Sequence, residues 1–103
     1  MATNNVYTLG RWLVKPGNED LFVEAWKGLG TFFQLLPEPP GVGTLVRSVD
    51  NPRLFYSFGP WPSAQAVAAM RANPRTPAEL GKLITLCEQA EPGTFSHVAT
   101  VGR

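Results

Sequence analysis

The sequence predicts one α+β domain over residues 1–103, with helices on one side of a four-stranded antiparallel sheet. Three observations predict this class. The length suffices for one hydrophobic core and is too short for two. Apolar residues make up 44% of the chain and charged residues 17%, as in folded globular proteins. Strand-like and helix-like patterns follow one another in the order strand, helix, strand, strand, helix, strand.

The first strand and the first helix have clear sequence signals. Val6–Val14 mixes β-branched, aromatic and aliphatic residues, which predicts a strand with both faces at least partly covered. Asn18 is a candidate helix N-cap, and Glu19 and Asp20 place negative charge where the helix dipole favours it. Apolar residues then recur at helical spacing as far as Leu36, which predicts a helix that packs on the sheet.

The middle of the chain predicts a hairpin. The loop at residues 37–41 is rich in proline and has few backbone donors, so we expect no helix to continue through it. Val42–Val49 and Leu54–Gly59 are rich in strand-forming residues, and a short turn cluster lies between them. We therefore expect these two strands to pair in antiparallel fashion.

The second helical region is predicted to be broken into two parts. Ser63 is a candidate N-cap for the first part, and Pro74 ends it. Thr76 and Glu79 have the spacing of a capping box, with proline at the first helical position between them. They are predicted to open a helix over residues 77–89.

The last strand completes a known arrangement of elements. Gly93–Val101 alternates between two sets of side chains, which predicts a strand. The full order is that of the split βαβ, or ferredoxin-like, βαββαβ fold. Because helices on one side leave the second face of the sheet uncovered, we expect a partner subunit to bury the apolar residues on that face.

Composition argues against several classes of function. The net charge is +1 and no run of like charges occurs, which argues against nucleic-acid binding. No stretch approaches the roughly 18 apolar residues of a membrane span, and the N-terminus lacks the pattern of a signal peptide. Cys87 is the only cysteine, so no disulfide can form within the chain. We expect a cytoplasmic protein that binds neither nucleic acid nor membrane.

Common catalytic constellations are missing from the sequence. One histidine, one cysteine and no clustered carboxylates predict no metal site, no nucleophile triad and no carboxylate pair. The glycines at 41 and 43 do not precede a helix, as a phosphate-binding glycine loop would require. We therefore predict no metal and no other cofactor.

Two stretches resemble a known family. In "RWLVKPGNEDLFVEAW" (residues 11–26) a strand leads through Lys-Pro-Gly and acidic residues into an aromatic helix. In "NPRLFYSFGPWPSAQAVAA" (residues 51–69) a strand ends at a tryptophan just before the second helix. With the element order, these stretches resemble the antibiotic biosynthesis monooxygenase family of the dimeric α+β barrel superfamily.

The resemblance implies a homodimer whose two sheets face each other as a barrel, with a substrate pocket in each subunit. It also implies activities found in that family: oxidation of aromatic polyketides by molecular oxygen without metal or flavin, or degradation of haem. Haem-degrading members use an asparagine on the first strand, a tryptophan after the third strand and a histidine in the second helix. Asn5 and Trp61 match the first two, whereas the histidine is missing, which argues against haem degradation.

Five single residues carry further predictions. His97 is the candidate catalytic base, because its ordinary pKa lies near neutrality and its strand neighbours are apolar. Tyr56 and Trp61 are candidates to donate a phenol O–H and an indole N–H to a ligand, although both could simply fill the core. Arg47 is a candidate for binding an anionic oxygen, with an ion pair in the dimer interface as the alternative. Asn5 is the remaining candidate for substrate binding.

The sequence leaves three functions open. The first is a small monooxygenase that oxidises an aromatic or polyketide-like molecule in an apolar pocket, without a cofactor. The second is a binding or isomerase module on the same fold, since a fold does not fix a function. The third is a haem-binding protein.

Overall fold

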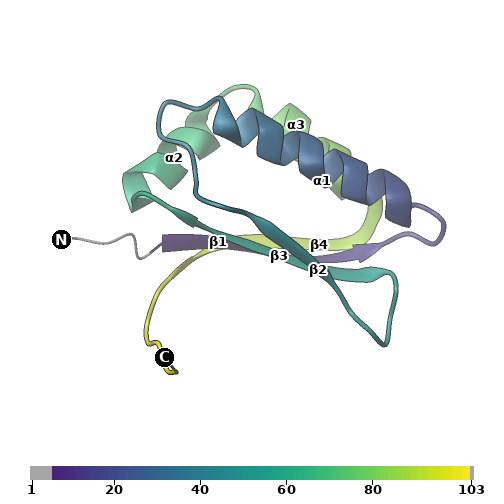
Figure 1. The fold of residues 1–103 in the computed structure, drawn as a ribbon. Coiled ribbons are helices and arrows are strands. Elements are labelled where there is room, and N and C mark those ends of the chain that lie inside the picture. The colour runs from purple at the N-terminus through teal and green to yellow at the C-terminus, as the bar shows by residue number, and fades with distance from the viewer. Residues whose placement is uncertain (1–5, 103) are drawn as a thin grey trace.

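The computed structural model describes residues 6–102 as one sheet with helices on one of its faces (Figure 1). The elements in chain order are β1 (Val6–Val14), α1 (Glu19–Gln34), β2 (Thr44–Arg47), β3 (Leu54–Trp61), α2 (Ala64–Ala72), α3 (Thr76–Ile84) and β4 (Cys87–Ser96). The four strands lie in the order β2-β3-β1-β4, and all neighbours are antiparallel. The predicted ferredoxin-like α+β class is therefore confirmed.

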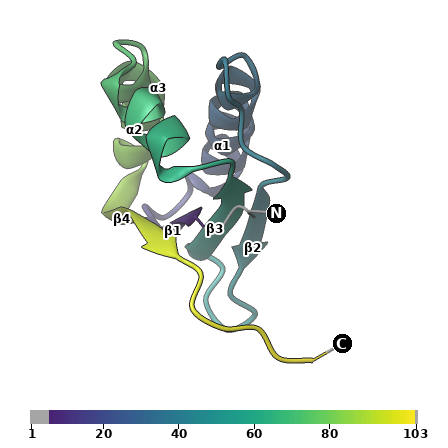
Figure 2. The same cartoon turned by 90° about the vertical axis from the view of Figure 1, so that its left-hand side faces the viewer.

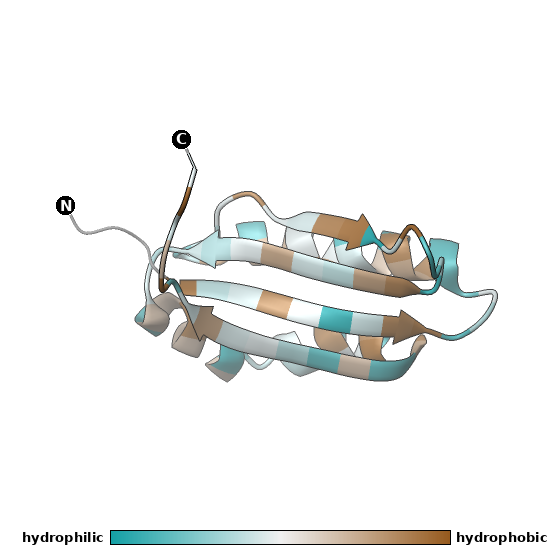
Figure 3. Cartoon of the chain, turned by 90° about the horizontal axis from the view of Figure 1, so that it is seen from below, coloured by the Kyte–Doolittle hydropathy of each residue, from teal (hydrophilic) through white to brown (hydrophobic). Residues whose placement is uncertain are grey.

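The helices stand above the sheet in two rows. Figure 2 shows α1 on one side and the pair α2 and α3 on the other, both on the same face of the sheet. The opposite face, seen in Figure 3, has no element packed on it within the described residues. Because side chains alternate along a strand, every second residue of β1 and β3 points toward the helices. This alternation decides which residues belong to the core.

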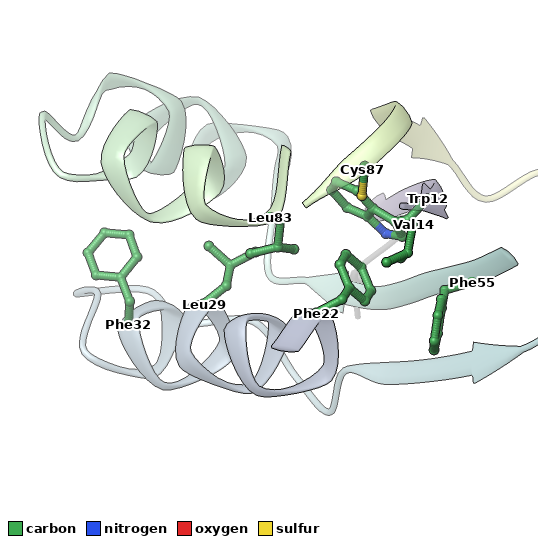
Figure 4. Close-up of a cluster of buried hydrophobic side chains, with 8 residues drawn as sticks. All are labelled: Trp12, Val14, Phe22, Leu29, Phe32, Phe55, Leu83 and Cys87. Carbon is green, nitrogen blue, oxygen red and sulfur yellow. The ribbon is translucent and has the colours of Figure 1, made fainter. Parts of the chain in front are cut away.

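The core at one end of the sheet is aromatic (Figure 4). The Phe22 ring on α1 lies 5.1 Å from the Phe55 ring on β3 and 5.7 Å from the Trp12 ring on β1, measured between centroids. Leu83 from α3 closes the cluster and is fully buried. Burying each of these side chains contributes roughly 2–3 kcal/mol. This cluster fixes α1 and α3 on the sheet at the end where β1 leads into α1.

The hairpin differs from its predicted bounds at both ends. The β2 strand is shorter than Val42–Val49, because the Ser48 hydroxyl accepts hydrogen bonds from the backbone N–H groups of residues 50 and 51 and so turns the chain. The β3 strand continues past Gly59 to Trp61, through Pro60. The Pro60 carbonyl accepts from the N–H of Gly41, so the position where proline lacks an N–H also faces away from β1. The ladder with β1 is therefore uninterrupted.

The C-terminal elements also differ from prediction. The helix predicted over 77–89 ends at Ile84, and the strand predicted from Gly93 to Val101 runs from Cys87 to Ser96. Glu88, Gln89 and Ala90 favour helices in isolation, but pairing with β1 along its whole length overrides that preference. The strand ends at Ser96, which lies opposite Val6, the first residue of β1 that the structure describes.

Of the three predicted N-caps, one is confirmed, one lacks its side-chain bond and one is wrong. Asn18 stands at the N-cap position of α1, but its side chain makes no capping hydrogen bond. The Ser63 hydroxyl accepts a hydrogen bond from Ala66 N at 3.0 Å, as expected of an N-cap. The capping box at Thr76 does not form, because the Thr76 hydroxyl instead donates to the Met70 carbonyl at 2.6 Å. Glu79 pairs with Arg75 at 3.1 Å rather than with the start of the helix. These contacts join the end of α2 to the start of α3 and explain the break between them.

No helix among residues 6–102 has both the length and the apolar composition that crossing a membrane requires.

Candidate functional site

A cavity of about 820 Å³ lies between the helix-facing side of the sheet and the three helices. Its floor is formed by β1 and β3, and its walls come from all three helices and from β4. Most of its lining is apolar or glycine. The floor residues are Thr8, Gly10, Trp12, Ser57, Gly59 and Trp61, and the wall residues include Trp26, Leu29, Phe33, Met70, Arg71, Leu80, Ile84 and Thr94.

Two glycines on the floor make room for this cavity. A Cβ atom at Gly10 would lie 2.5 Å from Nε1 of Trp12, so the indole can lie over β1 only because residue 10 has no side chain. A Cβ atom at Gly59 would lie 3.2 Å from the Cα of Gly43, so the loop before β2 passes close to β3 for the same reason. Gly10 therefore sets the position of Trp12, and Gly59 sets the position of the loop that forms one wall of the cavity.

The polar groups on the floor come as paired donors and acceptors. Nε1 of Trp12 donates to Oγ of Ser57, and Nε1 of Trp61 donates to Oγ1 of Thr8, both at 3.0 Å. Each hydroxyl uses a lone pair in this bond and keeps its own hydrogen to donate. Among the described residues, neither hydroxyl donates to a protein acceptor. The floor can therefore offer two O–H donors, each backed by an indole N–H, to a ligand in the cavity.

Trp61, one of the candidate ligand-binding residues, lines this cavity. It is the last residue of β3 and is 1% exposed, and its ring packs edge-on against Phe33 of α1 with 5.2 Å between centroids. Its indole N–H is aimed at Thr8 on the neighbouring strand rather than into open space. Trp61 is therefore both a core residue and part of the cavity floor. Whether it contacts substrate stays a prediction.

The structure does not bring His97 to the cavity. His97 follows the end of β4 in an exposed segment, where its Nε2 lies 2.7 Å from Oγ1 of Thr100. Its ring stands edge-on to Tyr7, with 6.4 Å between centroids. The expected burial in a strand is wrong, because β1 provides no partner beyond Ser96 within the described residues. Its role as a base stays a prediction, without support from the geometry of this chain.

Tyr56 and Arg47 also lie outside the cavity. Tyr56 is half-exposed on the uncovered face of the sheet, because its position in β3 alternates with the helix-facing residues Phe55 and Ser57. The Arg47 guanidinium lies over the Phe55 ring, 5.2 Å from the centroid, beside a separate pocket of about 310 Å³ near β2. Asn5 lies outside the residues that the structure describes.

Several polar residues of the cavity were not singled out from the sequence, among them Thr8, Ser57 and Arg71. Thr8 and Ser57 had a visible signal, because each is a hydroxyl residue that alternates into a strand face otherwise made of aromatic residues, glycine and valine. Arg71, on the last turn of α2, had none. Its position at the cavity depends on how α2 packs on the sheet, which the sequence pattern of a short alanine-rich helix does not determine.

Ionisable groups with a changed pKa lie away from the floor. Burial raises the pKa of the Cys87 thiol, which belongs to the aromatic core. The hydrogen bond from Arg75 lowers the pKa of Glu79, with a further contribution from Lys82. Within residues 6–102, no three His, Cys, Asp or Glu side chains gather closely enough to hold a metal ion. The cavity thus has a hydrogen-bonding floor rather than a titratable cluster.

Comparison with known proteins adds information on the fold. SnoaB, a cofactor-independent oxygenase from Streptomyces nogalater, superposes with a TM-score of 0.84 at 22% identity, covering 98% of this chain and 100% of SnoaB. An antibiotic biosynthesis monooxygenase of known structure gives a TM-score of 0.74 at 15% identity, covering 91% of this chain and 99% of the other. The chain shares its fold with these proteins. A conserved protein from Methanosarcina mazei is also similar, with a TM-score of 0.79 at 11% identity over 93% of this chain and 95% of the other.

These identities are low, so the likeness is one of fold. No protein-family model matches the sequence, and no curated protein matches it. The resemblance predicted from residues 11–26 and 51–69 is therefore confirmed for the architecture: a four-stranded antiparallel sheet with helices on one face. The reaction has to be argued from the cavity itself.

Proposed function

We propose that this protein is a small monooxygenase of the antibiotic biosynthesis monooxygenase type that oxidises a planar aromatic or polyketide-like molecule without a cofactor. The observation that carries the proposal is the largely apolar cavity of about 820 Å³ with two indole-backed hydroxyls on its floor. Its size falls within the range of roughly 300–1,000 Å³ typical of small-molecule sites. The shared fold with SnoaB, named a cofactor-independent oxygenase, supports the same reaction class.

The chemistry requires an electron-rich substrate. In a CH₂ group between two aromatic rings, transfer of one proton to solvent water at the cavity mouth gives a carbanion that is stabilised as an enolate or phenolate, and a proton returns from solvent when the peroxide forms. Transfer of an electron to O₂ and formation of a C–O bond give a peroxide, which loses water to leave a carbonyl group. One oxygen atom enters the substrate and the other leaves as water, and the substrate supplies all four electrons. The overall balance therefore needs only O₂ and the substrate.

The cavity residues would act on the anion rather than on oxygen. Ser57 is placed to donate a hydrogen bond to an oxygen atom on which negative charge develops, and Thr8 is placed to donate one to a second oxygen of the substrate; their indole partners polarise both hydroxyls further. The apolar walls exclude water, which strengthens such bonds. These roles do not involve His97, which lies outside the cavity. The action of His97 as a base is a separate prediction.

We further propose that the protein works as a homodimer through the uncovered face of the sheet. Figure 3 shows this face. Its exposed apolar residues come from all four strands and include Leu9, Val46, Tyr56, Phe58 and Phe95. Apolar residues gathered on one face of a sheet favour burial against a partner, and a second copy is the simplest one.

The reaction can be tested by oxygen uptake with a dihydroxyanthrone, whose central CH₂ group is the reacting type. Metal-depleted protein should accelerate formation of the anthraquinone over the rate in buffer, with one O₂ consumed for each quinone formed. Ser57→Ala should lower the rate by about tenfold or more, because it removes an oxyanion donor. Ser96→Ala, a serine outside the cavity at the end of β4, should not change it.

Two results would contradict the proposal. The first is a rate no higher than in buffer. The second is an equal effect of Ser57→Ala and Ser96→Ala, which would mean that the reaction does not take place on this floor. His97→Ala, measured in parallel, should abolish turnover if the histidine is the base and leave it unchanged if the cavity acts alone.

A second candidate function is a binding module without turnover. One observation favours it: no described side chain with an ordinary pKa near neutrality lines the cavity, so no general acid or base is in place. Binding of the anthraquinone product with no oxygen uptake from the anthrone would support this alternative. Haem binding has no comparable support, since the single histidine of the chain lies outside the cavity.

A further inference from the structure

The charged residues that line the cavity are all cations. They are Lys27 on α1 and Arg71 on α2, and no carboxylate belongs to the lining. Nζ of Lys27 lies 3.4 Å from Oε2 of Glu24, which offsets its charge. Arg71 forms no ion pair with any residue of the described chain. The guanidinium of Arg71 is therefore a source of positive charge that no described acidic group neutralises.

Arg71 lies near the mouth of the cavity, and the tryptophans lie in its depth. Arg71 and Thr94 are both exposed, and Nη2 of Arg71 donates a hydrogen bond to Oγ1 of Thr94. Trp12 and Trp61 are 2% and 1% exposed. A ligand that fills the cavity would therefore place an aromatic body over the floor and one edge beside the guanidinium.

Thr94 adds a further hydroxyl donor beside Arg71, at the mouth of the cavity. Thr94 lies directly opposite Thr8 in the pairing of β4 with β1, and both point toward the helices. Oγ1 of Thr8 accepts from Trp61, and Oγ1 of Thr94 accepts from Arg71. Within residues 6–102, neither threonine hydroxyl has a protein acceptor for its own hydrogen. Two O–H donors and a guanidinium thus face one end of the cavity.

We propose that the ligand is an aromatic carboxylate whose acid group is bound by Arg71, Thr94 and Thr8. This inference rests on the proposed function and adds the charge and the orientation of the substrate. A planar guanidinium presents parallel N–H donors that match the two oxygens of a carboxylate. The cation also excludes cationic aromatic molecules, because no carboxylate in the lining would compensate their charge. Arg71 is thus a specificity residue, distinct from the groups that face the reacting carbon.

The binding mode separates the acid group from the reacting atom. Ser57 lies opposite Gly10, two residues along β1 from Thr8, which is about 7 Å in an antiparallel strand. A fused aromatic ring system spans that distance. With the carboxylate at Thr8 and Thr94, the rings lie over Gly10, and the oxygen that becomes negative in the reaction meets Ser57.

The test compares a dihydroxyanthraquinone carboxylate with its methyl ester, which differ in charge and little in shape. Binding is followed by quenching of tryptophan fluorescence, since Trp12 and Trp61 line the cavity. Wild-type protein should bind the carboxylate about five to ten times more tightly than the ester. A fivefold preference is expected if Arg71 forms an exposed ion pair with the carboxylate, and a tenfold preference if it forms a charge-assisted bidentate contact.

Variants assign the effect to one residue. Arg71→Met should reduce the affinity for the carboxylate to that for the ester and leave the ester unchanged, whereas Arg71→Lys should keep part of the preference. Arg47→Met is the matched control, because this arginine lies outside the cavity and the sequence had suggested it for the same role. Thermal unfolding without ligand should be nearly the same for all variants, since the side chain of Arg71 is exposed.

Each outcome has a definite meaning. Equal binding of acid and ester by wild-type protein, or an equal loss of both in Arg71→Met, would overturn the inference while the aromatic cavity stands. Loss of the preference in Arg47→Met instead of Arg71→Met would overturn it in favour of the pocket near β2. If neither compound binds, the proposed function fails together with the inference.

Discussion

Replacing Gly10 with alanine should displace Trp12 from the floor of the cavity. The new Cβ atom would lie 2.5 Å from Nε1 of the indole and 2.6 Å from both Cε2 and Cζ2. Contacts this short do not persist, so the ring must move. The move breaks the Trp12–Ser57 hydrogen bond, worth about 1 kcal/mol, and disturbs the packing of the ring on Phe22, which costs roughly 1–3 kcal/mol for an overpacked core. We expect a total loss of about 2–4 kcal/mol in the free energy of unfolding.

Urea unfolding followed by circular dichroism measures this loss, and tryptophan emission reports the displaced ring. The matched control is Gly28→Ala on α1, where a Cβ atom would meet nothing within 4 Å. That variant should gain about 1 kcal/mol, because alanine favours the helix. A Gly10→Ala protein with the midpoint and the emission of wild type would refute the reasoning. So would an equal change in both variants.

Three further predictions concern the sheet face, the pH dependence and the thiol. Phe58→Glu should convert a dimer to a monomer in light scattering, because it puts charge in the middle of the uncovered face; an unchanged mass in solution would argue against the proposed interface. The pKa of Glu79 is lowered in the folded protein, so its stabilising effect is present above about pH 4.5 and is lost as the pH falls through the lower folded value. Glu79→Gln should therefore flatten the acid side of the stability profile, and parallel profiles for both proteins would contradict this. Since burial raises the pKa of Cys87, native protein should react with iodoacetamide near neutral pH far more slowly than unfolded protein; equal rates would mean that the thiol is accessible.

The fold was predictable because its local signals agree with one another. The alternation of Val6–Val14, the cap at Ser63 and the prolines around residue 40 each mark an element or a boundary that the structure has. The second half of the chain was harder. Residues 88–90 favour a helix by composition, and only their pairing with β1 makes them a strand. The predicted ends of helices and strands were wrong where pairing with a neighbouring strand, rather than the local sequence, decides whether the backbone is helical or extended.

The site was predictable to a smaller degree. Trp61 could be placed because prolines on both sides fix the backbone as β3 ends, and the structure puts it on the floor of the cavity. Tyr56 lies outside the cavity, because one step along the strand turns a side chain to the other face, and its role in ligand binding stays a prediction. His97 was expected in a strand that in fact ends one residue earlier.

The sequence by itself determined the order of the elements, the aromatic character of the core and the lack of a motif for metals or phosphates. Those properties depend on residue type and on spacing along the chain, which a sequence contains in full. The tertiary structure decided which hydroxyls meet which indoles, that Gly10 makes room for Trp12, and that Arg71 stands at the mouth of the cavity. These facts depend on strand register and on how α2 packs on the sheet. Both arise from contacts between residues that lie tens of positions apart in the chain, so no local pattern records them.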